Sequence, residues 1–142
     1  MLWPFAVIWS EDATATCLGR LTARNGTGAA TGRAGEGKFL KQADISAITC
    51  KVFDLDSATP DTAVATPAVT ISSAILDAPD TTDVIWTVDS WGYNFIHDIA
   101  NTVFTEGNRR YRVEYTVTLS AGLGSAVFHG AYEGQARAIR SS

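Results

Sequence analysis

Hydrophobic and polar side chains alternate over ten consecutive positions near the C-terminal end of the chain. One face of this stretch collects Tyr111, Val113, Tyr115, Val117 and Leu119. The opposite face collects Arg110, Arg112, Glu114, Thr116 and Thr118. A period of two is typical of a strand with one buried and one solvated face, and aromatic and β-branched residues suit such a surface. The pattern therefore predicts a long strand.

A second strand is predicted to pair with the first. The sequence Ala121-Gly122-Leu123-Gly124 supplies two glycines that adopt positive φ readily at a hairpin tip. After this turn, Ala126, Phe128 and Tyr132 alternate with Val127, His129 and Ala131. We expect a hairpin over residues 107–132, with the other strands packed around it.

The N-terminal half predicts shorter elements. Asp12 to Arg24 alternates, with one face made of Ala15, Cys17, Gly19, Leu21 and Ala23. Residues 39–47 predict one short helical turn that points Leu40, Ile45 and Ile48 inward. Ile48 to Leu55 predicts a strand, and residues 54–66 predict a polar loop around Pro60.

The following region is richer in turn formers. Pro67 to Ser72 predicts a short edge strand, and Ala74 to Asp83 predicts a turn-rich connection through Pro79. Val84 to Val88 predicts the start of another element. Gly92 to Ile99 predicts a strand that places Tyr93, Phe95 and His97 on one face.

These segments predict an all-β fold. About seven short strands, broken by Gly, Pro, Asp and Asn clusters and without a long amphipathic helix, are typical of an antiparallel two-sheet sandwich. Tyr111, near the start of the long strand and after a Gly-Asn turn, resembles the tyrosine corner of immunoglobulin-like folds. A chain of 142 residues suits one domain, so we expect a single immunoglobulin-like sandwich over residues 1–142, with a loose basic tail at 137–142.

The N-terminal segment, MLWPFAVIW, is unusually apolar for a chain end. It is too short to span a bilayer, and it lacks the basic region and cleavage site of a signal peptide. Residues 1–10 form either the first strand of a sheet or an arm that docks on another chain, and the sequence leaves both readings open. The candidate contact residues of such an arm are Leu2, Trp3, Phe5 and Trp9.

Five of the fourteen residues from Asn25 to Lys38 are glycine, which predicts a flexible loop. Its glycines do not have the G-x-G-x-x-G or Walker spacing that cradles phosphates, and no strand–helix unit surrounds them. A loop this long in a small domain is either functional or disordered. Its basic residues Arg33 and Lys38 are candidates for contact with a neighbouring chain.

Charge is spread unevenly along the chain. The formal net charge is −4, which argues against nucleic acid as the main partner. Between Ala43 and Glu106 there are ten acidic residues and one basic residue, whereas the two ends are basic. This division suits contact between copies. Cys17 and Cys50 lie in predicted strands, and we expect both to be reduced unless their strands are neighbours.

Candidate catalytic chemistry is sparse, and the sequence predicts neither an enzyme nor a metal or other cofactor. His97 and His129 are the only histidines, and neither stands in a metal-binding motif. No G-x-S-x-G elbow is present, and the carboxylates Asp83 and Asp89 stand in polar segments.

Three aromatic residues, Trp86, Trp91 and Tyr93, stand close to Asp89 in the sequence. Such a group suits either a sugar-stacking platform or an interface hot spot. We expect Trp86 in the core and Trp91 at an exposed contact, and we place Trp91 and Tyr93 among the candidate interaction residues.

The pattern of these segments also resembles a known group of proteins. Residues 86–89 (WTVD), 92–95 (GYNF), 111–115 (YRVEY) and 127–129 (VFH) together look like a small β-sandwich module of tailed-bacteriophage structural proteins. The layout is similar to the N-terminal domains of phage baseplate upper proteins. The likeness covers Ala13 to Glu133 and carries no catalytic residue.

The resemblance implies a non-enzymatic virion protein. The expected role is capsid decoration or cement, in which the segment Leu2–Trp9 and the loop Asn25–Lys38 bind neighbouring subunits. Those subunits are the major capsid protein or further copies of this chain in a homo-oligomer, with no nucleic-acid or membrane partner. Without a signal peptide, the chain is expected to be made in the host cytoplasm and to end up in the virion.

Other readings stay open at this point. A tail or baseplate adaptor is the alternative within the virion class. A carbohydrate-binding module that uses Trp86, Trp91 and Tyr93 is an alternative from another class. A small metal-dependent enzyme that uses His97 and His129 is a third.

Overall fold

The computed structural model describes residues 14–30 and 37–136, and nearly all of its regular structure is antiparallel strand. A four-stranded sheet contains β4 (Ile45–Asp54), β5 (Ala63–Ala65), β8 (Arg110–Leu119) and β9 (Val127–Gln135). Its strand order is β5-β4-β8-β9, and every neighbouring pair is antiparallel. The all-β class predicted from the sequence is therefore confirmed.

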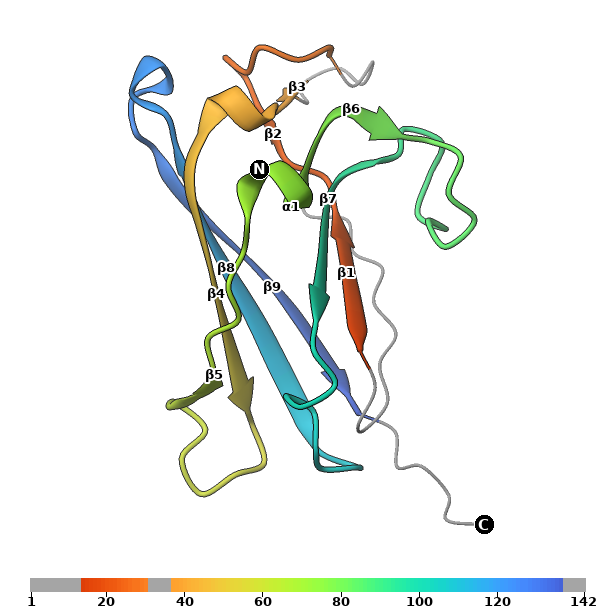
Figure 1. Cartoon of the computed structure of the whole chain (residues 1–142), viewed down its shortest axis with the longest axis vertical. Coiled ribbons are helices and arrows are strands. Elements are labelled where there is room, and N and C mark those ends of the chain that lie inside the picture. The colour runs from red at the N-terminus through yellow and green to blue at the C-terminus, as the bar shows by residue number, and fades with distance from the viewer. Residues whose placement is uncertain (1–13, 31–36, 137–142) are drawn as a thin grey trace.

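A three-stranded sheet faces the larger one (Figure 1). It contains β1 (Ala15–Gly19), β6 (Ile75–Asp80) and β7 (Tyr93–Ile99) in the order β1-β7-β6. The short strands β2 (Thr22–Ala23) and β3 (Lys38–Phe39) form a separate pair at one end. Figure 1 shows β4, β8 and β9 of the larger sheet and β1 and β7 of the smaller one running along the long axis of the molecule, with β6 lying across its upper end.

Within residues 14–30 and 37–136, helical structure is limited to single turns. The 3₁₀ turns η1 and η2 span Gln42–Asp44 and Ala121–Leu123, and α1 spans Ile71–Ala74. The turn predicted near residues 39–47 is present, and Leu40, Ile45 and Ile48 are buried beside it as expected. In the ranges that the structure describes, no helix has the length and apolar character needed to cross a membrane.

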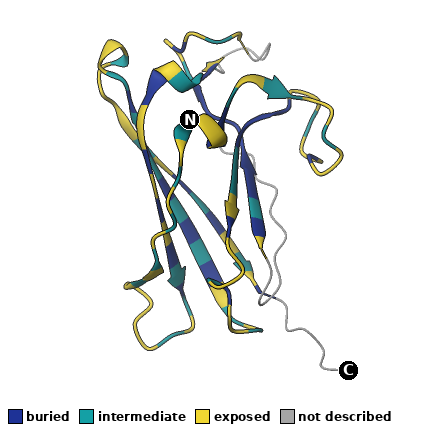
Figure 2. Cartoon of the chain, in the orientation of Figure 1, coloured by how far each residue is buried: buried dark blue, intermediate teal, exposed yellow. Residues whose placement is uncertain are grey.

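The predicted C-terminal hairpin is confirmed. Burial alternates along β8, and its pairing with β9 is regular from Arg110 opposite Gln135 to Thr118 opposite Val127. Gly124 closes the tip with φ of 78°, a conformation that glycine adopts without strain. Figure 2 shows the resulting pattern, with buried positions on the strands and exposed ones at the loops.

The main core lies between the two sheets and is organised around Tyr115. Its ring meets Phe95 of β7 edge-on at 4.9 Å and Tyr132 of β9 at 5.9 Å between ring centroids. The Tyr132 hydroxyl donates a hydrogen bond to the carbonyl of Leu18 on β1, at 2.5 Å. This bond ties the four-stranded sheet to the three-stranded one across the core.

The two cysteines lie in different sheets, Cys17 on β1 and Cys50 on β4. Both are buried free thiols. Burial raises the pKa of each thiol to about 12, because a thiolate loses its hydration there. Both groups therefore stay protonated at neutral pH.

The structure differs from the sequence prediction in four segments between residues 54 and 88. Residues 67–72 form no strand, because this segment crosses from one sheet to the other and packs Val69 and Ile71 against the core. Residues 75–80, predicted as a connection, form β6, in which Pro79 is tolerated because β6 is an edge strand. The predicted loop 54–66 contains the short β5, and residues 84–88 contain no strand.

Candidate functional site

The loop between β6 and β7, residues 81–92, exposes more large apolar side chains than any other described segment. It contains four of the six such residues in the described parts of the chain, with exposed fractions of 90% for Val84, 50% for Ile85, 41% for Val88 and 36% for Trp91. Figure 1 shows the loop projecting beyond the end of its sheet. Apolar side chains gathered at one exposed tip mark a candidate contact surface.

Aspartate side chains fix the first half of this loop. One carboxylate oxygen of Asp80 accepts hydrogen bonds from the backbone N–H groups of Thr82, at 2.9 Å, and Asp83, at 3.1 Å. Asp83 in turn accepts the N–H of Ile85 at 3.0 Å. Such Asx turns divert the backbone from strand pairing, which is why Val84 to Val88 is a loop despite its strand-like composition.

Arg20 anchors the second half. Its side chain is only 3% exposed, and it forms an ion pair with Asp89 and donates from Nε to the carbonyl of Gly92 at 3.2 Å. The guanidinium carbon lies 5.9 Å from the centroid of the Trp86 ring, within cation–π range. One buried arginine therefore holds three positions of the loop.

Asp89 is the centre of this network. Besides Arg20, its carboxylate accepts the indole N–H of Trp86 at 3.3 Å and the backbone N–H of Trp91 at 3.0 Å. Burial raises the pKa of Asp89, but these hydrogen bonds, with that from Arg20 first, outweigh it and hold the pKa below its ordinary value. The carboxylate is therefore ionised at neutral pH and keeps all of its partners.

A second apolar cluster packs between the 81–92 loop and the three-stranded sheet. Trp86 packs on Tyr93 with 5.5 Å between ring centroids, and Leu18, Leu76 and Ile96 complete the cluster. The Tyr93 hydroxyl donates to Asp83 at 2.7 Å. Trp86 is buried, as predicted, but in this satellite cluster rather than in the core between the sheets.

The predicted contact residues differ in how far the structure exposes them. Trp91 is partly exposed at the loop tip, and Lys38 is exposed at the start of β3. Tyr93 is only 3% exposed, so its ring supports the loop and offers no contact surface. The remaining five candidates, Leu2, Trp3, Phe5, Trp9 and Arg33, lie outside the described residues.

Sequence reasoning missed Arg20, Val84 and Ile85. Arg20 stands within an alternating segment, where a charged residue reads as solvent-facing, and its partner is 69 positions away. The spacing of Asp80, Asp83 and Asp89, each followed two residues later by an N–H that it binds, was the available signal for a structured loop.

The structure does not bring the two histidines together. His97 faces the core and contacts the Tyr115 hydroxyl at 2.7 Å, whereas His129 contacts Thr116 at 3.0 Å on the outward face of the four-stranded sheet. Across residues 14–30 and 37–136, no group of three or more His, Cys, Asp and Glu side chains is placed to hold a metal ion.

A hollow of about 350 Å³ lies beside His97. It is lined by Ala68, Thr70, Ser73, Ala74, Ile96, His97 and Asp98. Both ring nitrogens of His97 are engaged, since the second one contacts the carbonyl of Ala68 at 3.0 Å. Asp98 accepts the hydroxyl of Thr16 at 2.6 Å. The two titratable side chains that line this hollow, His97 and Asp98, are therefore both hydrogen-bonded to other residues of the chain.

The setting of His97 predicts a pH-dependent stability. Burial lowers its pKa below the ordinary 6.5, against smaller opposing effects of the Ala68 carbonyl and Asp98. Between pH 6.5 and the lower pKa of the folded chain, His97 is therefore protonated in the unfolded chain and neutral in the folded one. The free energy of unfolding is full above pH 6.5 and falls as the pH drops from 6.5 to the folded pKa, by at most about 1.4 kcal/mol per pH unit. Urea unfolding at pH 7 and pH 5 measures this loss.

A His97→Gln variant is the control, because glutamine keeps hydrogen-bonding atoms but does not titrate. The carboxylates Asp56, Asp80 and Asp89, whose pKa values lie below the ordinary 3.8, contribute only at lower pH. We expect the variant to lose less stability than the wild type between pH 7 and pH 5. Equal losses would show that His97 does not govern this window.

A scan against protein-family models, a search of curated proteins and a search of solved structures each returned no match for this chain.

Proposed function

We propose that this chain is a non-enzymatic, immunoglobulin-like binding module of a phage virion, which decorates or cements the capsid through the 81–92 loop. The observation that carries this proposal is the apolar tip of the loop, held in place by a buried arginine. The resemblance of residues 13–133 to phage β-sandwich modules motivates the virion setting.

The strand order supports the immunoglobulin-like part of the proposal. In such folds one sheet has the order G-F-C, extended by C′ in the variable type, and the other contains B, E and D. Here β9-β8-β4-β5 and β1-β7-β6 follow the same two orders. The Tyr111 hydroxyl, at the start of β8, lies 3.3 Å from the backbone nitrogen of Glu106 and 3.4 Å from its carbonyl oxygen. A tyrosine corner makes this kind of backward contact.

The hydrogen bonds and the ion pair that hold the loop support a binding role. Ordering a loop on association costs free energy, and a loop already held by hydrogen bonds avoids most of that cost. Asp80, Asp83 and Asp89 bind the backbone, and Arg20 holds Asp89 and Gly92. Trp91 contributes a partly exposed aromatic ring, the kind of side chain that dominates protein interfaces.

The same geometry gives little support to a sugar-binding platform. Of the three aromatic residues near Asp89, Trp86 and Tyr93 are buried, and only Trp91 is exposed. A flat stacking surface for a sugar needs rings open to solvent. The described loop therefore suits an apolar protein surface better.

Two matched substitutions test the proposal. Ile85, in the loop, and Val64, on β5, are exposed to the same degree, at 50% and 51%. We expect the wild-type chain to co-sediment with capsids of the phage or prophage that encodes it. Ile85→Asp should weaken this binding at least tenfold, since about 1.5 kcal/mol is lost when a buried apolar side chain is replaced by one that resists burial. Val64→Asp should bind like the wild type.

The outcomes separate the alternatives. Binding to purified tails and not to capsids would move the chain to the adaptor role. Binding to neither fraction would refute the virion proposal. Equal weakening by both substitutions would show that the 81–92 loop is not the contact surface.

A further inference from the structure

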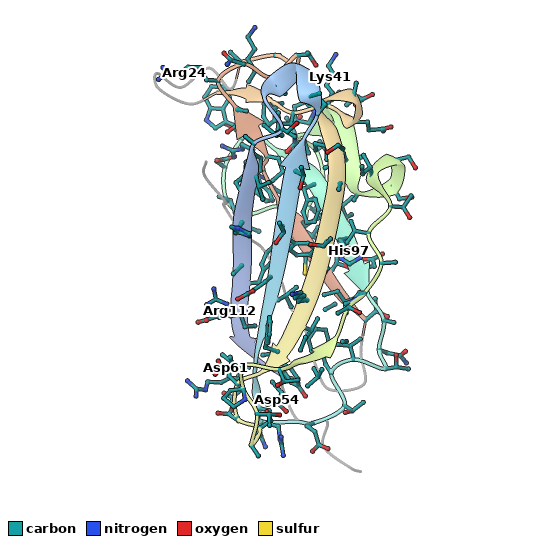
Figure 3. The ribbon with its side chains drawn as sticks, turned by 90° about the vertical axis from the view of Figure 1, so that its left-hand side faces the viewer. Arg24, Lys41, Asp54, Asp61, His97 and Arg112 are labelled. Atoms are coloured by element: carbon teal, nitrogen blue, oxygen red, sulfur yellow. The ribbon has the colours of Figure 1, made fainter. Side chains whose placement is uncertain are left out.

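The free edge of β9 differs from the other strands that end a sheet. Edge strands are normally protected by shortness, proline, charge or irregular pairing. β5 has three residues, β1 has five, and β6 contains Asp77, Pro79 and Asp80 with an irregular register. β9 has nine residues, no proline, regular pairing with β8 and one acidic residue, Glu133. Among the described residues, no strand pairs with its outer side, which lies at one margin of the sheet in Figure 3.

The hydrogen bonds between β8 and β9 show which backbone groups of β9 face outward. The carbonyl of Ala126 accepts from Leu119 at 2.8 Å, and the N–H of Ala136 donates to Arg109 at 3.0 Å. In an antiparallel ladder only alternate residues bond to one neighbour, so the even-numbered residues of β9 bond to β8. The odd-numbered residues, including Ala131 at the centre, present their N–H and C=O groups at the free edge.

We propose that β9 pairs antiparallel with β9 of a second copy, about a two-fold axis at Ala131, to form one continuous sheet across a homodimer. This axis lies midway between the two copies of Ala131, the middle residue of β9, so all nine residues of each copy are paired. It places Ala131 opposite itself and Val127 opposite Gln135 of the second copy. A two-fold axis makes the contact isologous, so every pair other than that between the two copies of Ala131 occurs twice.

The outward side chains fit this register. His129 comes to lie opposite Glu133 of the second copy, and the reverse pair forms on the other side of the axis. Both side chains project from the outward face, where His129 contacts Thr116 and Glu133 contacts Arg112 at 2.8 Å within one copy. Figure 3 shows Arg112 on this face. A histidine opposite a carboxylate is a favourable cross-strand pair.

The inward side chains fit the same register. Phe128 lies opposite Gly134 of the second copy, and Tyr132 lies opposite Gly130. Each large ring thus meets a glycine, which leaves room for it. A shift of the axis to Glu133 would place two carboxylates opposite each other and leave part of each strand unpaired, which costs free energy. Charge, size and overlap therefore select one register.

The test uses the full chain in solution. We expect the wild-type mass, measured by sedimentation or light scattering, to be twice the monomer mass of 15.1 kDa. Ala131→Pro removes an N–H that points to the free edge and is not bonded to β8, so the fold is kept and pairing between copies is lost. Ala131→Thr is the matched control, because it retains the N–H and suits a strand. We expect a monomer for the proline variant and a dimer for the threonine variant.

A cross-linking experiment tests the register. Cysteine at position 131 stands opposite itself, with the Cα separation near 5.5 Å that suits a disulfide. With diamide as oxidant, Ala131→Cys should give a covalent dimer, and Val127→Cys should not, because it faces position 135. A monomeric wild-type chain at about 0.1 mM, or a dimeric Ala131→Pro variant, would overturn the edge-pairing proposal. A covalent dimer formed by Val127→Cys but not by Ala131→Cys would overturn the register. None of these outcomes depends on whether capsids bind, so the virion proposal is tested separately.

Discussion

Replacing Arg20 with leucine should destabilise the folded chain by about 3 kcal/mol, the low end of the range for removing one partner of a buried ion pair. Leucine fills much of the space but leaves the carboxylate of Asp89, whose side chain is 22% exposed, without its cationic partner. The carbonyl of Gly92 loses a donor as well. Urea unfolding at pH 7, read as the change in free energy of unfolding, measures the effect.

Arg112→Leu is the matched control for Arg20→Leu. Arg112 also forms ion pairs, with Glu114 at 2.7 Å and Glu133 at 2.8 Å, but all three side chains are at least 40% exposed. Water solvates these charges in both the folded and the unfolded chain, so the control should lose less than about 1 kcal/mol. Similar losses in the two variants would mean that the burial of Arg20 does not set its contribution.

Physical patterning explains which elements could be predicted from the sequence. The β8–β9 hairpin was predictable because one face of each strand is buried and the other is solvated, so burial leaves a period of two in the residues. β6 was not predictable in the same way. It pairs with β7 at only two positions on either side of an irregularity, and Pro79 is compatible with it only because it lies at an edge.

The candidate site was partly predictable for a related reason. Trp91, set between Ser90 and Gly92, reads as exposed from local composition alone, and the structure leaves it partly exposed. Arg20 owes its burial to partners that are far away in the sequence, and no local pattern encodes such a pairing. Val84 and Ile85 have the composition of a strand, and the side-chain hydrogen bonds of Asp80 and Asp83 decide against it.

The second large effect is expected at Gly92, where alanine should destabilise the fold by about 3 kcal/mol or more, the sum of a left-handed conformation and a steric clash. The φ of Gly92 is 83°, and an added Cβ would lie 2.2 Å from the carbonyl oxygen of Asp80 and 2.7 Å from its carbonyl carbon. Both are backbone atoms at the end of β6, so the strand or the loop must move. This movement would also disturb the hydrogen bond from Arg20 to Gly92.

Two glycines in the β8–β9 turn separate the causes of this effect. Gly124 has nearly the same φ, 78°, but open space around its Cβ position, and Gly122 has open space without a positive φ. Gly124→Ala should therefore cost about 1 kcal/mol, the conformational part alone, and Gly122→Ala should be close to neutral. Free energies of unfolding for the three variants give the order. If Gly92→Ala lowered the free energy of unfolding no more than Gly124→Ala, the close approach of Asp80 to Gly92 would not constrain the loop. The argument that the 81–92 loop is held in place as a contact surface would then fail as well.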